Sequence, residues 1–478
     1  MGLMLSPEVK LRRDGGRAIL FSINPADMKE EPVFRFLYPQ YAVILTLFDG
    51  QRNLEEVTKA VAYLFNIGSE IASQEVEALL DLSVNKEKTI RSLIVDTSII
   101  NLKKARLYDP YDFIVPADKI DMSNLRCKMP CSLIVLPTMR CVTSCIYCYA
   151  DREGMCGQPE LDLKLYKRLI VEAKECGIET IDISGGDLFC REDAFDFVEC
   201  TLSKGMYLTI PTKYPLSRDQ VNRLAKMGLS TIQISIDALL PDIIDIMVAR
   251  SGYGKKILKT LDYLGEADIQ VRTNTVLTPY NIKDAVNLAR HLVQMPHIFR
   301  CGFTSYGRSL YCHQDNLFCS PNDLEEFERE LNQIRAEFPH KFLTFSGVYP
   351  DPYSGNEKEK SSVFWERPFC TANQRAAVIL PNGKVTICEE LYFHECFIIG
   401  DLTKQTLMEV WNSPRALELM HPDQSLIPDG PCKDCPDFRR CHEERGRCFR
   451  DTLKAYGYNK PYWPDPRCPR APAGNRLV

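Results

Sequence analysis

The stretch Cys141-Val-Thr-Ser-Cys145-Ile-Tyr-Cys148 decides how the chain is interpreted, and it closely follows the apolar run Ser132 to Leu136. Three thiols this close together in a loop are typical of a metal site. A structural zinc site needs four ligands in a closed tetrahedron, whereas this loop supplies three. A zinc knuckle completed by Cys131 or Cys156 is the alternative. The loop itself indicates a metal centre that keeps one coordination position for an outside ligand.

Length and composition limit the possible classes of protein. A chain of 478 residues suggests two to four domains, and 45% hydrophobic with 26% charged residues is typical of a globular protein. The net charge of -5, without a Lys/Arg block, predicts neither nucleic acid nor an anionic membrane as a partner. The N-terminus lacks the apolar segment of a signal peptide, so we expect a cytoplasmic protein. Twenty cysteines in a reducing compartment favour metal ligation over disulfides.

Strands and helices alternate after a Pro- and Asp-rich stretch, residues 101–129, which we interpret as a linker. The alternation predicts an α/β fold, a partial (β/α)6 barrel with parallel strands, over residues 130–345. The expected strands are Ser132 to Leu136, Glu179 to Ser184, Tyr207 to Ile210, Thr231 to Ile236, Gln270 to Val276 and Ile298 to Phe303. The expected helices start near Leu161, Glu192, Ser217, Pro241, Asn281 and Pro321.

Polar residues follow several of these strands, at the carboxyl ends where chemistry collects in parallel barrels. The second strand runs into Ser184-Gly-Gly-Asp187, where the glycines let the backbone approach a ligand and the carboxylate can accept from an ammonium. Ser235 and Asp237 share one face of the fourth strand, and buried polar groups cost free energy without a partner. Arg272 and Asn274 project together from the fifth strand. A ligand carboxylate or an interstrand salt bridge would each explain this arginine.

The cysteine loop resembles the signature of the radical S-adenosylmethionine (SAM) superfamily, C-x3-C-x2-C with an aromatic residue, here Tyr147, before the last cysteine. The resemblance implies that Cys141, Cys145 and Cys148 hold a catalytic [4Fe-4S] cluster. SAM would chelate its open iron and be cleaved by one electron to a 5′-deoxyadenosyl radical. Asp187 would replace the Glu of the family's Gly-Gly-Glu motif at the SAM amine. The cofactor-binding residues expected on this basis are Tyr147, Ser184, Gly185, Gly186, Asp187, Ser235, Asp237, Arg272 and Asn274.

Cysteines become dense beyond a second predicted linker, residues 346–366. The spacing C-x12-G-x4-C followed by C-x2-C-x5-C resembles the SPASM domain of peptide-modifying radical SAM enzymes, which implies two auxiliary [4Fe-4S] clusters within residues 367–478. The implied ligands are Cys432, Cys435, Cys441 and Cys468 for an outer cluster, and Cys370, Cys388 and Cys448 for an inner one. The alternative is a zinc ribbon made by Cys432, Cys435, Cys441 and Cys448, but it leaves three cysteines unexplained.

Two features of this region keep alternatives open. Six residues separate Cys441 from Cys448, where the family commonly has three, so the role of Cys448 is the less secure assignment. Glu389 follows Cys388, where a related group of SPASM enzymes places an Asp that takes the substrate proton. With three cysteines on the inner cluster, its fourth iron would be open to a peptide thiolate. If Cys396 fills that position, the cluster is an electron relay and Glu389 an exposed charge.

Residues 1–100 are predicted to form a separate winged-helix-like domain, with strands Ala18 to Ile23 and Val33 to Leu37 and then three helices. The second helix opens with the capping-box-like Asn53-Leu-Glu-Glu56, and the Glu-rich third helix would be repelled by DNA. Leu47-Phe-Asp-Gly50 followed by Leu54-Glu-Glu-Val57 resembles the PqqD-like leader-peptide recognition domain known from the pyrroloquinoline quinone pathway. The resemblance implies that a leader adds a strand beside Val33 to Leu37. A merely structural extension is the alternative.

Taken together, these features resemble a radical SAM/SPASM peptide maturase. The implied activity is hydrogen abstraction from a ribosomally synthesised precursor peptide with formation of a Cys thioether crosslink. The implied partners are that peptide and a reductant such as flavodoxin or ferredoxin. Alternative activities are carbon-carbon or carbon-oxygen crosslinking, epimerisation, and formylglycine formation. An iron-sulfur redox sensor is the alternative from another class, but a sensor would not need the polar strand faces.

Overall fold

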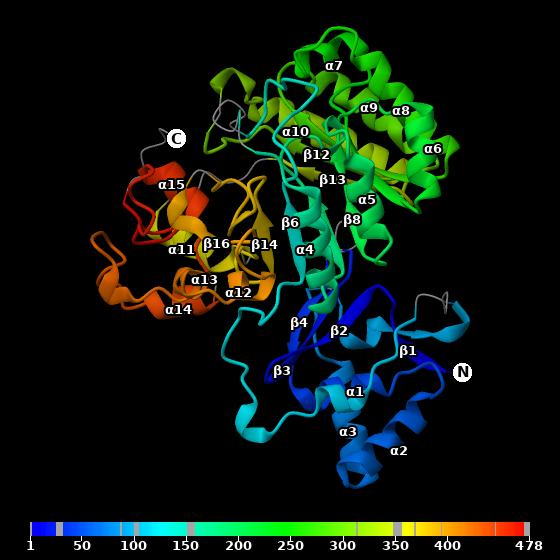
Figure 1. Ribbon diagram of the computed structural model, residues 1–478, viewed down its shortest axis with the longest axis vertical. Helices are drawn as coiled ribbons and strands as arrows, with labels where there is room; N and C mark the ends of the chain where they lie inside the picture. The colour runs from blue at the N-terminus through cyan, green and yellow to red at the C-terminus, as the bar shows by residue number, and fades with distance from the viewer. Residues whose placement is uncertain are drawn as a thin grey trace. The chain divides into compact units, whose positions relative to one another are not determined.

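The computed structural model describes residues 2–24, 32–86, 88–99, 105–150, 157, 159–311, 314–347, 356–367, 370–392, 394–444 and 446–472. It divides into two compact units, Met1–Met129 and Pro130–Val478, here called the N-terminal and the C-terminal unit; Figure 1 shows their elements. Cys156, one candidate for completing a zinc knuckle, lies outside the described residues. Within those ranges, no helix is both long enough and apolar enough to cross a membrane.

The N-terminal unit is built on a three-stranded antiparallel sheet in the order β2-β3-β4. Its strands are β2 (Val9–Asp14), β3 (Arg17–Ser22) and β4 (Phe34–Leu37), and a separate pair joins β1 (Leu3–Leu5) to β5 (Ile94–Asp96). Every residue of the central strand β3 is buried. The sequence predicted β3 and β4 but missed β2, because basic residues interrupt its apolar pattern; one of them, Arg12, is buried against the Phe21 ring.

Three helices follow the sheet, namely α1 (Pro39–Thr46), α2 (Leu54–Phe65) and α3 (Ser69–Leu80). The predicted capping box is present, since Asn53 Oδ1 accepts from the Glu56 amide and Glu56 Oε2 accepts from the Asn53 amide. The helical spacing of the apolar residues predicts that Val57, Val61 and Leu64 of α2 and Ile71 of α3 are buried. Val57 and Val61 are buried, whereas Leu64 and Ile71 are about half exposed. These two side chains lie in the last turn of α2 and the first turn of α3, which extend beyond the sheet (Figure 1).

The end of the first predicted linker is anchored to this sheet. Arg17 forms a buried ion pair with Asp14 (Nε to Oδ2, 3.0 Å) and donates to the carbonyl of Arg126 (2.9 Å). Arg12 donates to the carbonyl of Met129 (2.7 Å). Since these partners all belong to the N-terminal unit, the stretch before Pro130 is part of that unit's packing.

The C-terminal unit contains the predicted partial barrel of parallel strands. One sheet includes β6 (Ser132–Val135), β7 (Thr180–Ile183) and β8 (Tyr207–Thr209); the other consists of β9 (Pro211–Thr212), β10 (Thr231–Ser235), β11 (Gln270–Leu277), β12 (Ile298–Ser305) and β13 (Phe342–Ser346). Only Ile210 separates β8 from β9, so one stretch of chain passes from the first sheet into the second. The predicted fold class is thereby confirmed.

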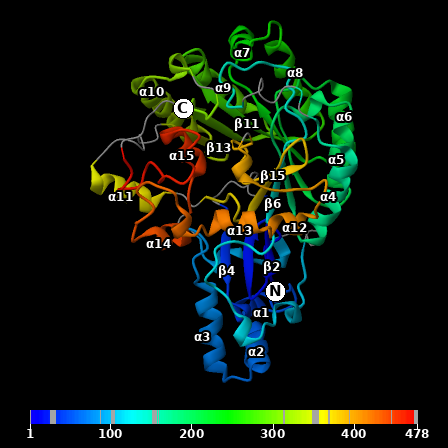
Figure 2. The same cartoon turned by 60° about the vertical axis from the view of Figure 1, so that its left-hand side comes forward.

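Helices cover the outside of these strands, and Figures 1 and 2 show α4, α5 and α6 side by side along one outer face. The helices are α4 (Leu163–Glu175), α5 (Ala194–Leu202), α6 (Arg218–Lys226), α7 (Pro241–Met247), α8 (Gly254–Glu266), α9 (Ile282–Gln294) and α10 (Pro321–Glu337). The sequence missed α8, which starts at a glycine and has no side-chain cap. The main core of the unit lies between these helices and the strands.

The cysteine-rich region continues the barrel sheet. β14 (Ala376–Ile379) pairs in parallel with β6, and antiparallel β15 (Lys384–Thr386) and β16 (Ile398–Asp401) extend the sheet outward. The helices of this region are α11 (Glu357–Glu366), α12 (Leu407–Trp411), α13 (Pro414–Met420), α14 (Phe438–Glu444) and α15 (Phe449–Tyr456). α11 lies in the stretch interpreted as the second linker, where its capping box at Asn356 and Glu359 starts a helix.

Candidate functional site

The glycine turn after β7 packs on the segment that leads into the three-cysteine loop. The amides of Gly186 and Asp187 donate to the carbonyls of Thr138 and Arg140, both at 2.8 Å. A Cβ on Gly186 would lie 2.3 Å from the Arg140 oxygen, and a Cβ on Gly185, whose φ is +92°, would lie 2.8 Å from that of Thr138. The sequence predicted that these glycines let the backbone approach a ligand. In the structure they let two backbone segments meet, which fixes the start of the cysteine loop.

Asp187 is buried, and donors of the protein itself occupy the acceptor positions of its carboxylate. Oδ1 accepts from the Phe189 amide (3.1 Å), Oδ2 accepts from the amides of Lys213 (2.9 Å) and Tyr214 (3.0 Å), and the Thr212 hydroxyl lies 3.0 and 2.8 Å from the two oxygens. A carboxylate has about four acceptor positions, so none is left for an outside ammonium. Burial raises the pKa of Asp187, although these hydrogen bonds act in the opposite direction. In this arrangement Asp187 joins the turn after β7 to the segment after β9.

Two predicted cofactor residues meet a lysine that the sequence analysis did not select. Tyr147 donates to Asp237 Oδ2 (2.7 Å), and Lys213 Nζ forms an ion pair with the same oxygen (2.7 Å) and donates to the carbonyl of Ser235 (3.3 Å). The side chain of Asp237 is 1% exposed and that of Lys213 is 14% exposed. Burial, together with the Asp237 charge, raises the pKa of Tyr147. Lys213 follows the third strand, so the strand-end argument could have found it.

The remaining predicted cofactor residues lie on the strands of the second sheet. Ser235, Asn274 and Gly302 are register partners across β10, β11 and β12. A Cβ on Gly302 would lie 3.3 Å from Asn274 Oδ1, so a larger residue at this position would press against the Asn274 side chain. Arg272 lies two residues before Asn274 and is in register with Arg300. All of these residues are half-buried while those between them on β10 and β11 are buried, which places them on the polar face that the sequence predicts.

The three-cysteine loop is held at the end of α7. The amides of Ser144 and Ile146 donate to the carbonyls of Val248 and Met247, both at 3.0 Å, and the Thr143 hydroxyl lies 3.4 Å from Cys145 Sγ. The three thiols are half-buried. Within the described ranges, no three His, Cys, Asp or Glu side chains form the arrangement that a single metal ion requires. A four-iron cluster places its thiolates on separate irons, and soft thiols suit iron-sulfur ligation.

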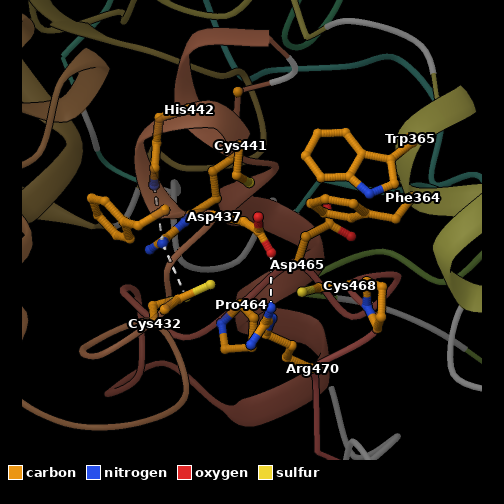
Figure 3. A pocket seen from close by; sticks show the side chains of 15 residues that line it. Phe364, Trp365, Cys432, Asp437, Cys441, His442, Pro464, Asp465, Cys468 and Arg470 are labelled. Carbon is orange, nitrogen blue, oxygen red and sulfur yellow. Dashed lines mark hydrogen bonds and ion pairs between the residues drawn. The ribbon is translucent and has the colours of Figure 1, made fainter. Parts of the chain in front are cut away.

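The predicted ligands of the outer cluster line one pocket, here called the outer cysteine pocket. It contains about 540 Å³ of space, partly open to solvent, and its cysteines are Cys432, Cys435, Cys441 and Cys468. Figure 3 shows Cys432, Cys441 and Cys468 around the same space. Gln424 Nε2 fixes the C-x2-C turn by donating to the carbonyls of Cys432 (3.1 Å) and Cys435 (2.9 Å). The described residues that line this pocket include Cys468 and do not include Cys448. The zinc-ribbon alternative would need Cys448 in place of Cys468.

Charged side chains lie close to the predicted inner ligands. Burial raises the pKa of Cys388 to about 12, and burial together with Asp451 raises that of Cys448. Arg450 pairs with Asp451 (3.2 Å) and Glu390 (2.7 Å). Cys370 lines a second pocket of about 360 Å³. Thiols with raised pKa values must lose their protons before they bind metal, so cluster assembly here releases protons.

Cys396, the candidate fourth ligand, is not among the described residues that line either pocket. It is exposed, and its carbonyl accepts from Arg415 Nε (2.9 Å). Neither observation places its thiol beside Cys370 or Cys448.

Glu389, in the cysteine-rich region, contacts the end of a barrel strand. Its Oε2 accepts a hydrogen bond from Ser184 Oγ (2.5 Å), and Ser184 directly follows β7. The Tyr149 hydroxyl, next to the last cysteine of the loop, lies 3.4 Å from the same Ser184 oxygen. Burial raises the pKa of Glu389 more than this hydrogen bond lowers it. Glu389 is therefore a half-buried, hydrogen-bonded carboxylate and not an exposed charge.

Comparisons with known proteins match these two regions. Residues 135–292 match the radical SAM superfamily and residues 370–436 match SPASM, an iron-sulfur cluster-binding domain. The chain is 24% identical over 357 residues to the PqqA peptide cyclase of Bradyrhizobium diazoefficiens, covering 72% of this chain and 87% of that protein. It is 25% identical over 361 residues to the PqqA peptide cyclase of Gluconobacter oxydans, covering 73% and 93%.

Solved structures extend the similarity of the fold over nearly the whole chain. Streptococcus suis SuiB bound to S-adenosylmethionine aligns with a TM-score of 0.64 and 17% identity, covering 98% of this chain and 99% of that one. SuiB bound to its precursor peptide SuiA aligns with a TM-score of 0.63 and 16% identity, covering 99% of each chain.

The matched segments contain the site built above. The three-cysteine loop, the glycine turn and the Lys213–Asp237 pair lie within residues 135–292, and Cys370, Cys388, Cys432 and Cys435 lie within residues 370–436. The matches to the radical SAM superfamily and to the SPASM domain confirm the predicted cofactors, SAM with a [4Fe-4S] cluster in the barrel and auxiliary iron-sulfur clusters in the cysteine-rich region. The chain therefore combines a barrel region that matches the radical SAM superfamily with a cysteine-rich region that matches the SPASM iron-sulfur cluster-binding domain.

Proposed function

We propose that this enzyme modifies a ribosomally synthesised precursor peptide by hydrogen abstraction and forms a Cys thioether crosslink. The observation that supports this most directly is the 2.5 Å hydrogen bond between Ser184 and Glu389. It brings a carboxylate of the cysteine-rich region to the end of a barrel strand, where substrates of parallel barrels react. Relatives named peptide cyclases and a similar structure bound to a precursor peptide favour a peptide as the substrate.

Different residues of the chain have different roles in the proposed reaction. When bound, SAM and the clusters supply the hydrogen-abstracting radical and the one-electron acceptors that such a reaction needs. Lys213, Asp237 and Tyr147 form a fixed polar wall beside the cysteine loop. A thioether forms when one hydrogen atom leaves a carbon and one proton leaves a thiol, with one electron. We assign the proton to Glu389, which Ser184 holds in place.

We also infer that the N-terminal unit binds the leader of the precursor as a PqqD-like domain. In the sheet as described, β4 lies at one edge, because the strand order is β2-β3-β4. An edge strand offers unpaired backbone groups to which an extended peptide can add. Phe34 and Phe36 of β4 are half-buried and contact each other edge to face, so they offer apolar surface to such a peptide.

Mass spectrometry of the treated precursor tests the bond that is formed. A thioether predicts the loss of two hydrogens per crosslink and cysteines that resist alkylation. Glu389→Gln should lower product formation about 100-fold, the usual contribution of a general base, while 5′-deoxyadenosine still forms. Glu395→Gln is the matched control, because Glu395 is exposed and pairs only with Lys384 among the described ion pairs. Loss of two hydrogens with every cysteine still alkylatable would indicate a carbon-carbon or carbon-oxygen product.

A shortened enzyme tests the role of the N-terminal unit. It should start at Pro130, because the residues just before this position are bound to the N-terminal sheet. SAM cleavage should persist, while modification of the full-length precursor should fall roughly 100-fold, the advantage that a second binding module typically gives. If the shortened and the complete enzyme modify that precursor at equal rates, the leader-binding role is wrong.

A further inference from the structure

A buried arginine connects the two pockets of the cysteine-rich region. Arg447 lines both the outer cysteine pocket and the pocket beside Cys370, together with Gly446 and His442. It is 9% exposed. His442 and Arg447 are the first and last of the six residues between Cys441 and Cys448, so the wide spacing noted in the sequence provides both of them.

The guanidinium of Arg447 contacts a predicted cluster ligand and a histidine. Its Nη2 lies 3.4 Å from Cys432 Sγ and 3.3 Å from His442 Nε2, and Figure 3 draws both contacts as dashed lines. Arginine only donates, so the imidazole nitrogen must accept, which requires a neutral ring protonated on Nδ1. His442 is thus a fixed acceptor that orients Arg447 toward the sulfur.

The second amino group of Arg447, Nη1, is buried and, within the described residues, lacks a hydrogen bond. A buried cation with an unpaired donor costs free energy unless an anion lies nearby. The carboxylates of the same pocket already have partners, since Asp437 pairs with Arg470 (2.9 Å) and Asp465 with Arg467 (2.8 Å). A thiolate-ligated cluster is the anion that fits this donor.

We propose that Arg447, oriented by His442, raises the reduction potential of the outer auxiliary cluster. With four thiolates, a [4Fe-4S] cluster in its 2+ state carries a total charge of about -2, and one added electron makes it about -3. A cation within hydrogen-bond distance of a ligand sulfur stabilises the more negative state more strongly, so reduction becomes easier. Arg447 is therefore a positioning residue that acts on the cluster through Cys432.

A redox titration of the reconstituted full-length enzyme tests this assignment. With dithionite as the one-electron reductant and electron paramagnetic resonance as the readout, Arg447→Gln should shift the midpoint of the outer cluster to a more negative potential. The midpoint of the catalytic cluster should stay unchanged, and that of the inner cluster should shift less, because the sulfur that Arg447 contacts is Cys432 of the outer cluster. The signal lost in Cys435→Ser identifies the outer cluster. Arg447→Lys keeps the charge but not the planar fork and should give a smaller shift.

Arg439→Gln is the matched control, because it also removes one positive charge. Arg439 lies on α14, is 88% exposed and is paired with Glu443. It should leave all three potentials unchanged. An unchanged outer potential in Arg447→Gln, at full iron content, overturns the proposal. If Arg447→Gln loses the outer cluster, His442→Phe decides, since it keeps Arg447 and removes its acceptor. A negative shift there supports the proposal, and no shift overturns it. These readouts need no peptide, so they do not depend on the proposed peptide modification.

Discussion

The carboxylates beside the cysteine loop of the barrel and beside the outer cysteine pocket are paired in different ways. Beside the loop, Asp237 has one cation among the described ion pairs, Lys213. Around the pocket the contacts are shared, since Asp465 is within ion-pair distance of both Arg367 and Arg467. A buried carboxylate with one cation is left uncompensated when that cation is removed, whereas a carboxylate with two cations keeps one. The two should therefore respond differently to substitution.

The largest difference is expected when thiols are removed. Replacing Cys141, Cys145 and Cys148 with Ala should abolish 5′-deoxyadenosine formation while the auxiliary iron remains. Replacing Cys432 and Cys435 with Ala should remove the iron of the outer cluster and leave SAM cleavage measurable. Chromatography of the nucleoside products and iron analysis check both. Unchanged SAM cleavage in the triple variant would contradict the assignment of the catalytic cluster.

Removing one cation from each site should separate single from shared ion pairs. Lys213→Met leaves Asp237 buried without its cation and should cost about 3–5 kcal/mol of stability. Arg467→Met should cost less, about 1–2 kcal/mol, because Asp465 keeps Arg367 and Asp451 keeps Arg450. Thermal unfolding of the two variants under identical conditions gives the comparison. Equal losses would show that the second arginine does not compensate.

The smallest chemical change, a single added methyl group, tests the glycine turn. Gly186→Ala places a Cβ 2.3 Å from the Arg140 oxygen and should cost about 1–3 kcal/mol, with less iron bound by the adjacent loop. Gly307→Ala is the control, because nothing lies within 4 Å of the Cβ it would add. Unfolding temperature and iron content of the purified proteins measure both effects. A tolerated Gly186→Ala would mean that the loop can shift without loss.

The sequence predicted the features that depend on local spacing. The alternation of strands and helices predicted β6, β7, β10, β11 and β12, and the resemblance to the SPASM domain implied the four cysteines that line the outer cysteine pocket. Features that depend on contacts between distant segments were not accessible. The hydrogen bonds that occupy the Asp187 carboxylate come mainly from Thr212 and its neighbours, which lie at the end of a later strand. The hydrogen bond between Glu389 and Ser184 depends on the pairing of β14 with β6. Leu64 and Ile71 follow the helical period but lie beyond the sheet that would bury them.

The parallel pairing of β6 with β14 has a consequence for synthesis. β6 is the first barrel strand that the ribosome releases, but its partner on one side, β14, emerges only after the whole barrel. Until then β6 presents an apolar edge, the kind of surface at which unfinished chains aggregate. Long-range parallel pairing of this kind also forms slowly. Truncation before Ala376 should therefore yield an insoluble barrel, and slower translation across residues 300–376 should lower the yield of the complete enzyme.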